Sequence, residues 1–156
     1  MLIVPVTGDK ITVKDTEEVL VVSSYTNLKK EPALYIEGNS ADAVIFFSQI
    51  EEINGVKVSY NSTSKVFDSL GPLKRKINLP QIGDLLSVED GKEIKEIEVK
   101  NLKLHDRNKK SFGLLVSDGI DTYSLKQIKE ISSKSNLSNP NIVQFRKYYI
   151  DYFPLV

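Results

Sequence analysis

Basic side chains form two clusters whose residue types and spacing could bind an anionic polymer. The first cluster has a basic or near-basic side chain at every second position, and the next residue is also basic: Lys103, His105, Arg107 and Lys109, followed by Lys110. Because successive side chains of a strand point to opposite faces, the first four share one face of an extended segment. The other cluster is Lys74-Arg75-Lys76, which follows Gly71-Pro72. Since lysine and arginine displace counterions from phosphates, both clusters predict contact with a DNA or RNA backbone. The alternative is a solvated strand face whose lysines protect an edge, with a solvated linker.

The densest group of aromatic residues lies near the end of the sequence, within residues 145–153. Its apolar residues recur at helical spacing, and Asn139-Pro140 indicates a cap and first turn, with Pro154 as the stop. Such a helix most simply covers a β-sheet core with its apolar side. Tyr148 and Tyr152 are the candidates for contact with a protein partner if they project away from that buried face.

Residues for catalysis and for metal or cofactor binding are scarce. The chain has no cysteine and one histidine, and it has no glycine-rich phosphate-binding loop. On an extended strand His105 and Asp106 point to opposite faces, so they form no acid–base pair. Asp118-Gly119 lies between two apolar runs and predicts a hairpin turn, because glycine supplies the positive φ that a tight turn needs. We therefore expect a protein that is not an enzyme, with no catalytic residues, metal or cofactor.

Charge is balanced overall but distributed unevenly. The 21 lysines and arginines equal the 21 aspartates and glutamates, yet residues 1–56 hold 4 basic against 9 acidic side chains. Residues 57–80 hold 5 against 1, so any contact with nucleic acid is expected to be local. No apolar run approaches the roughly 18 residues of a membrane span. Together with the absence of cysteine, this predicts a cytoplasmic protein without membrane contact.

An internal repeat determines the expected architecture. Residues 8–15 and 83–90 share the frame Gly-Asp-x-Ile/Leu-x-Val-x-Asp, and residues 49–53 and 127–131 share the frame Gln-Ile-x-Glu-Ile. Between these frames, short runs of β-branched and aromatic residues alternate with turn residues, as is typical of antiparallel strands. Strands this short bury little as open sheets, so closure into small barrels is expected.

The order of a Gly-Asp-x-Ile-x-Val strand, a long second strand, a Leu-x-x-Asp-Gly hairpin and a closing Tyr-x-Leu-x-x-Ile-x-x-Ile strand resembles SH3-like barrels of the KOW and Tudor type. The expected fold is mainly β, with two tandem small SH3-like antiparallel barrels and a C-terminal α-helix. The predicted boundaries are residues 1–58 for the first barrel, 59–80 for a basic connector, 81–131 for the second barrel, and 132–156 for a loop and the aromatic helix.

The resemblance to KOW-type barrels implies a non-enzymatic module that binds nucleic acid or associates with transcription. Similar barrels occur in elongation factors, in ribosomal proteins and in phage-encoded modulators of host transcription. The basic residues of both clusters would make the contacts with DNA or RNA, and the transcription machinery is a possible protein partner. The alternative function is a protein-interaction adaptor or structural protein that uses the acidic first barrel or the aromatic helix.

Overall fold

A computed structural model describes residues 1–38, 44–132 and 141–153. Its contacts divide the chain into two compact units, Met1–Lys74 with Asp106–Phe112, and Arg75–His105 with Gly113–Val156. The expected mainly β class is confirmed, because the described residues form antiparallel sheets and a single α-helix near the C-terminus. No described helix has the length and apolar character needed to cross a membrane.

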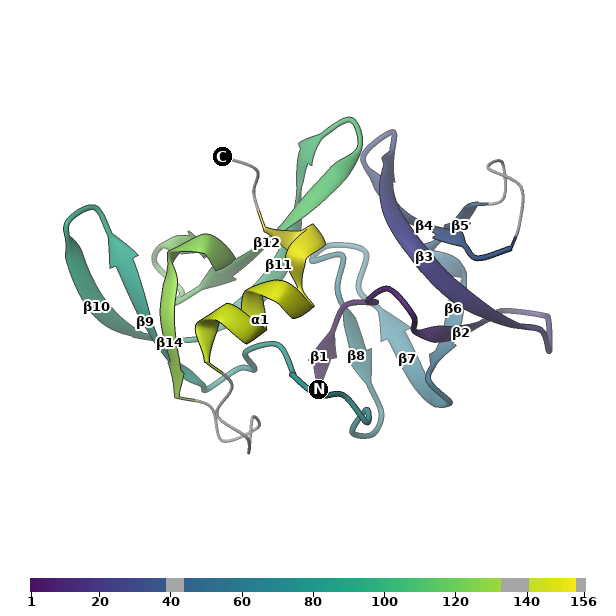
Figure 1. Ribbon diagram of the computed structural model, residues 1–156, viewed down its shortest axis with the longest axis horizontal. Helices are drawn as coiled ribbons and strands as arrows, with labels where there is room; N and C mark the ends of the chain where they lie inside the picture. The colour runs from purple at the N-terminus through teal and green to yellow at the C-terminus, as the bar shows by residue number, and fades with distance from the viewer. Residues whose placement is uncertain (39–43, 133–140, 154–156) are drawn as a thin grey trace. The chain divides into compact units, whose positions relative to one another are not determined.

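The first unit contains an eight-stranded sheet in the order β1-β8-β7-β6-β2-β3-β4-β5 (Figure 1). Its strands are β1 Leu2–Ile3, β2 Lys10–Val13, β3 Val19–Leu28, β4 Glu31–Ile36, β5 Val44–Phe46, β6 Ile50–Ile53, β7 Val56–Tyr60 and β8 Phe67–Ser69. A 3-10 turn, η1 Phe47–Gln49, connects β5 to β6. The sheet therefore contains a five-stranded meander, β6-β2-β3-β4-β5, extended beyond β6 by three further strands.

The second copy of the repeat lies in the second unit except for residues 106–112, which belong to the first, and it forms two three-stranded sheets, β10-β9-β14 and β11-β12-β13. Its strands are β9 Leu85–Asp90, β10 Glu93–Glu98, β11 Asn101–Asn108, β12 Ser111–Ser117, β13 Thr122–Ser124 and β14 Ile128–Ser132. The 3-10 turn η2 Leu125–Gln127 precedes β14, as η1 precedes β6. In the described residues no sheet of either unit closes, so the two-barrel architecture is not confirmed.

The Gly-Asp frame builds the same corner in both units. Gly8 N–H donates to Val22 O and Gly83 N–H donates to Val99 O, each at 2.8 Å. The carboxylates of Asp9 and Asp84, 6% and 7% exposed, accept the N–H groups of Val6 and Gln81 at 2.8 and 2.7 Å. Both glycines have φ near +90°, a conformation that other residues rarely adopt. The first frame of the repeat therefore encodes a buried, hydrogen-bonded corner.

The Gln-Ile frame closes both units in the same way. Gln49 Oε1 accepts Phe46 N–H at 2.8 Å, and Gln127 Oε1 accepts Ser124 N–H at 2.9 Å. The strand that follows each glutamine pairs with the strand of its own Gly-Asp frame, β6 with β2 and β14 with β9. The glutamine thus anchors the 3-10 turn that leads the chain into its last meander strand.

Part of the segment predicted as a connector, residues 59–80, belongs to the first sheet. Tyr60 ends β7, and β8 pairs with both β7 and β1. The rings of Phe47, Tyr60 and Phe67 form a cluster with centroids 5.2–6.1 Å apart. Val66 and Phe67 are buried, as expected for a segment that packs against the first unit rather than extending into solvent. The boundary between the units falls between Lys74 and Arg75.

Tyr60 is expected to make this cluster sensitive to alkali. Burial, and secondarily the charge of Glu31, raise the pKa of Tyr60 to about 12 from 10.0. The unfolded chain releases this proton at lower pH than the folded chain, so stability should fall as pH rises from about 10 to about 12. Urea unfolding midpoints of the wild type and Tyr60→Phe should diverge over this range, with the wild type losing more. Parallel pH profiles for the two proteins would contradict the assignment.

The C-terminal helix covers the second unit, as its apolar spacing predicts. Helix α1, Ile142–Tyr148, is capped by Asn141, whose side chain accepts Gln144 N–H at 2.9 Å, and it lies against β14 (Figure 1). Asn139, Pro140 and Pro154 lie outside the described residues. Phe145 and Tyr149 are buried, and Tyr149 Oη donates to Ile77 O at 2.6 Å. The helix therefore contributes core to its unit.

Candidate functional site

Strand β11 carries the alternating basic residues. Leu102 and Leu104 are buried, while Lys103 is exposed and His105 and Arg107 are half-buried, so these three basic side chains share the face opposite the leucines. Lys109 and Lys110 are not on the strand. They form the two-residue turn between β11 and β12, because Asn108 Oδ1 accepts Lys110 N–H at 2.8 Å and turns the chain. The expected stripe is therefore shorter by one residue and ends in a basic hairpin tip.

A second lysine pair lies at the tip of the β3–β4 hairpin. Lys29 and Lys30 occupy the turn with φ of 53° and 68°, a left-handed conformation that asparagine and glycine adopt more readily. Asn27 Oδ1 accepts Lys30 N–H at 2.8 Å. Each unit's repeat thus has a Lys-Lys turn in the same hairpin of its meander. The sequence prediction missed Lys29 and Lys30, although aligning the two copies strand by strand would have matched them to Lys109 and Lys110.

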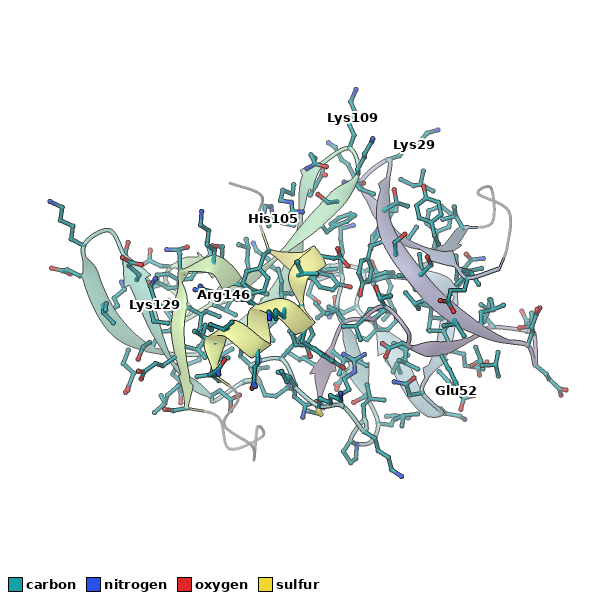
Figure 2. All side chains as sticks on the ribbon, in the orientation of Figure 1. Lys29, Glu52, His105, Lys109, Lys129 and Arg146 are labelled. Atoms are coloured by element: carbon teal, nitrogen blue, oxygen red, sulfur yellow. The ribbon has the colours of Figure 1, made fainter. Side chains whose placement is uncertain are left out.

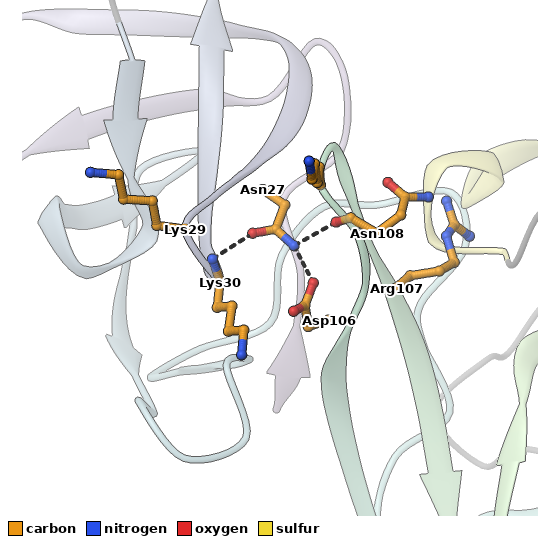
Figure 3. A pocket seen from close by; sticks show the side chains of 7 residues that line it. Asn27, Lys29, Lys30, Asp106, Arg107 and Asn108 are labelled. Atoms are coloured by element: carbon orange, nitrogen blue, oxygen red, sulfur yellow. Dashed lines mark hydrogen bonds between the residues drawn. The ribbon is translucent and has the colours of Figure 1, made fainter.

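Asn27 joins the two hairpin tips inside the first unit, to which residues 106–112 belong. Its side chain is only 5% exposed. Its amide nitrogen donates one hydrogen to the carboxylate of Asp106 and another to Asn108 O, the latter at 2.7 Å (Figure 3). With Lys30 N–H on its oxygen, one amide makes three hydrogen bonds to two chain segments. We call this arrangement the Asn27 clip.

The two tips enclose a pocket of about 550 Å³. It is lined by residues of both tips, namely Asn27, Lys29, Lys30, Asp106, Arg107, Asn108 and Lys109 (Figure 3). Four of the lining residues are cationic and one, Asp106, is acidic. Because the Asp106 carboxylate already accepts a hydrogen bond from Asn27, the pocket has an excess of positive charge and favours an anionic ligand.

The lysines of the tips keep their charge available to a ligand. Figure 2 shows Lys29 and Lys109 extending from their turns. Lysines elsewhere in the chain form ion pairs, such as Lys95 with Asp90 at 3.2 Å and Lys129 with Glu89 at 2.7 Å. Within the described residues, no ion pair involves the tip lysines, Lys29, Lys30, Lys109 and Lys110. Arg107 is more constrained, since its Nε donates to Ser111 Oγ at 3.0 Å.

The predicted cluster Lys74-Arg75-Lys76 does not line this pocket. Lys74 and Lys76 are exposed and Arg75 is half-buried, with buried Leu73 and Ile77 on either side. The division between the units separates Lys74 from the other two. Of the eight basic residues predicted to bind nucleic acid, the pocket therefore includes two, Arg107 and Lys109.

Tyr152 does not meet the condition for an interaction residue, because it is buried with 2% exposure. The α-helix ends at Tyr148, and the chain continues in a 3-10 turn, η3 Ile150–Tyr152. Tyr152 lies three residues after Tyr149 and seven after Phe145, and helical spacings of this kind place all three residues on the buried side. Tyr148 remains half-buried, with its ring edge-on to that of Tyr149 at a centroid distance of 4.9 Å.

Carboxylates and the single histidine form no further binding site in the described parts of the chain. There, no group of three or more His, Cys, Asp or Glu side chains lies close enough to hold a metal ion. Asp118 Oδ1 accepts the N–H groups of Ile120 and Asp121 at 2.9 and 2.7 Å, which lowers the pKa of Asp118. Its carboxylate therefore serves the predicted hairpin turn.

Comparison of the whole chain with known proteins identifies no matching family model, no matching curated protein and no matching solved structure.

Proposed function

We propose that this protein is a non-enzymatic nucleic-acid-binding module and that the pocket between its two lysine tips contacts the phosphate backbone. The observation that carries the proposal is the pocket itself, where two Lys-Lys turns contribute cations with no ion-pair partner among the described residues. Phosphate contacts of this kind hold a nucleic acid in place without specifying its sequence.

The proposal includes a finer view of the fold, in which each unit is an SH3-like barrel of the KOW or Tudor type. It is supported by a pairing that both copies of the repeat share: the strand after each 3-10 turn pairs with the strand of its own Gly-Asp frame, β6 with β2 and β14 with β9. On this view the lysine tips are the matching β3–β4 and β11–β12 hairpins of the two copies. An association with the transcription machinery belongs to the same proposal and follows from the resemblance alone.

A salt titration tests the proposed function. We expect the logarithm of the association constant for DNA or RNA to fall linearly with the logarithm of salt concentration, because each neutralised phosphate releases counterions. The variant Lys29→Ala/Lys109→Ala removes one lysine from each tip. For duplex DNA its slope should be shallower by about 0.9 for each phosphate that the variant no longer neutralises.

The matched control is Lys14→Ala/Lys57→Ala, which removes the same charge from exposed positions of the first unit outside the pocket. It should keep a slope close to that of the wild type. Absence of any binding at low salt, or an equal change of slope in both double variants, would rule out the pocket as the nucleic-acid site.

A further inference from the structure

We propose, on the basis of the function proposed above, that the pocket binds the sugar–phosphate backbone of a double helix and does not read bases. The ligand class is thus a nucleic-acid duplex of any sequence. The inference rests on which chemical groups the pocket offers to a ligand and on which are already engaged within the protein.

The side-chain amides at the tips are occupied. Asparagine can read adenine by donating and accepting hydrogen bonds at the base edge. Here both amide hydrogens of Asn27 go to Asp106 and Asn108 O, and its oxygen accepts Lys30 N–H. Asn108 Oδ1 accepts Lys110 N–H. The asparagines therefore shape the pocket, and the cationic side chains that line it are left to contact a ligand.

Among the residues that the structure describes, no aromatic side chain lines the pocket. Proteins that hold single strands combine a basic groove with aromatic rings on which successive bases stack, and stacking supplies much of their affinity. Without rings for stacking, the four cationic side chains of the pocket gain affinity from phosphates. Since duplex DNA carries one negative charge per roughly 1.7 Å of its axis, it presents more phosphates to the two tips than a single strand does.

The β3–β4 turn has the backbone conformation of a tight two-residue hairpin turn. Both Lys29 and Lys30 have positive φ, which disfavours residues with a Cβ atom. Such a conformation persists where surrounding structure enforces it. The Asn27 clip supplies that enforcement, because it holds Lys30 N–H directly.

The experiment compares four probes of equal length: a G·C-rich duplex, an A·T-rich duplex, a single strand, and an abasic single strand with the same backbone. We expect the two duplexes to bind with equal affinity, within about twofold, since a protein that reads base edges loses roughly fivefold or more per wrong base pair. The two single strands should bind equally to each other and more weakly than the duplexes. Lys29→Ala/Lys109→Ala should weaken all four by a similar factor, unlike Lys14→Ala/Lys57→Ala.

Different failures have different meanings. A preference for one duplex sequence, or tighter binding of the normal single strand than of the abasic one, would overturn this inference and leave the proposed function standing. Tighter binding of single strands than of duplexes would also overturn the inference and leave the proposed function standing. Failure to bind any of the four probes at low salt would overturn both.

Discussion

Asp9→Ala is expected to lower the free energy of unfolding by about 3 kcal/mol, because the carboxylate of Asp9 holds the corner that opens the first meander. It accepts Val6 N–H at 2.8 Å and the amide of Asn54 at 3.0 Å, and it is almost fully buried. A hydrogen bond to a charged group contributes about 1.5–3 kcal/mol, and alanine would leave the buried Val6 N–H without its acceptor. Asp84→Ala should also lower the free energy of unfolding, because Gln81 N–H would lose its acceptor.

Urea unfolding followed by circular dichroism measures the loss of stability in both variants. The control is Glu37→Ala, which removes an exposed carboxylate from the same unit and should change stability by no more than about 0.5 kcal/mol. If Asp9→Ala is no less stable than Glu37→Ala, the aspartate of the shared frame does not stabilise the corner.

The second large effect is expected for Asn27→Asp, which replaces the donor of the Asn27 clip with a carboxylate. The new carboxylate would face the carboxylate of Asp106 and the carbonyl of Asn108, so two hydrogen bonds would become repulsions. We expect unfolding free energy to fall by about 3 kcal/mol and duplex affinity to fall by more than tenfold, because the tips would separate. Urea unfolding and a binding titration report the two effects.

The double variant Asn27→Asp/Asp106→Asn separates geometry from charge. It has the net charge of the wild type, and the amide of residue 106 can donate to the carboxylate of residue 27. We expect it to recover part of the stability, with a coupling energy of about 1–3 kcal/mol. Asn61→Asp is a matched control, because Asn61 Oδ1 only accepts the N–H groups of Thr63 and Ser64. A double variant as unstable as Asn27→Asp would show that residues 27 and 106 do not act as a pair.

Local patterns in the sequence predicted local structure. The repeat identified both Gly-Asp corners and both closing strands, and the Asp118-Gly119 pair identified a hairpin whose glycine has φ of 93°. Apolar spacing identified Phe145 and Tyr149 as buried. The same spacing applies to Tyr152, which follows Phe145 by seven residues and is buried, so its proposal as an exposed interaction residue was wrong.

The candidate site was harder to predict, because it depends on a contact between residues far apart in the sequence. Asn27 and Asp106 are 79 positions apart, and no periodicity connects them. Each lysine tip alone is indistinguishable from a solvated turn. Only the folded chain shows that Asn27 brings Lys29 and Lys30 to the same pocket as Arg107 and Lys109.

The duplicated frames could cause misfolding, because the closing strand of one copy could pair with the opening strand of the other copy. Exchange of equivalent elements is a characteristic failure of repeated sequences. The two copies differ in charge at matching positions: Lys14 and Glu51 in the first correspond to Glu89 and Lys129 in the second. An exchange would put Lys129 beside Lys14 and Glu51 beside Glu89, whereas correct pairing joins Lys129 to Glu89 at 2.7 Å. Since like charges on paired strands repel, inversion of sign between the copies directs each strand to its own partner.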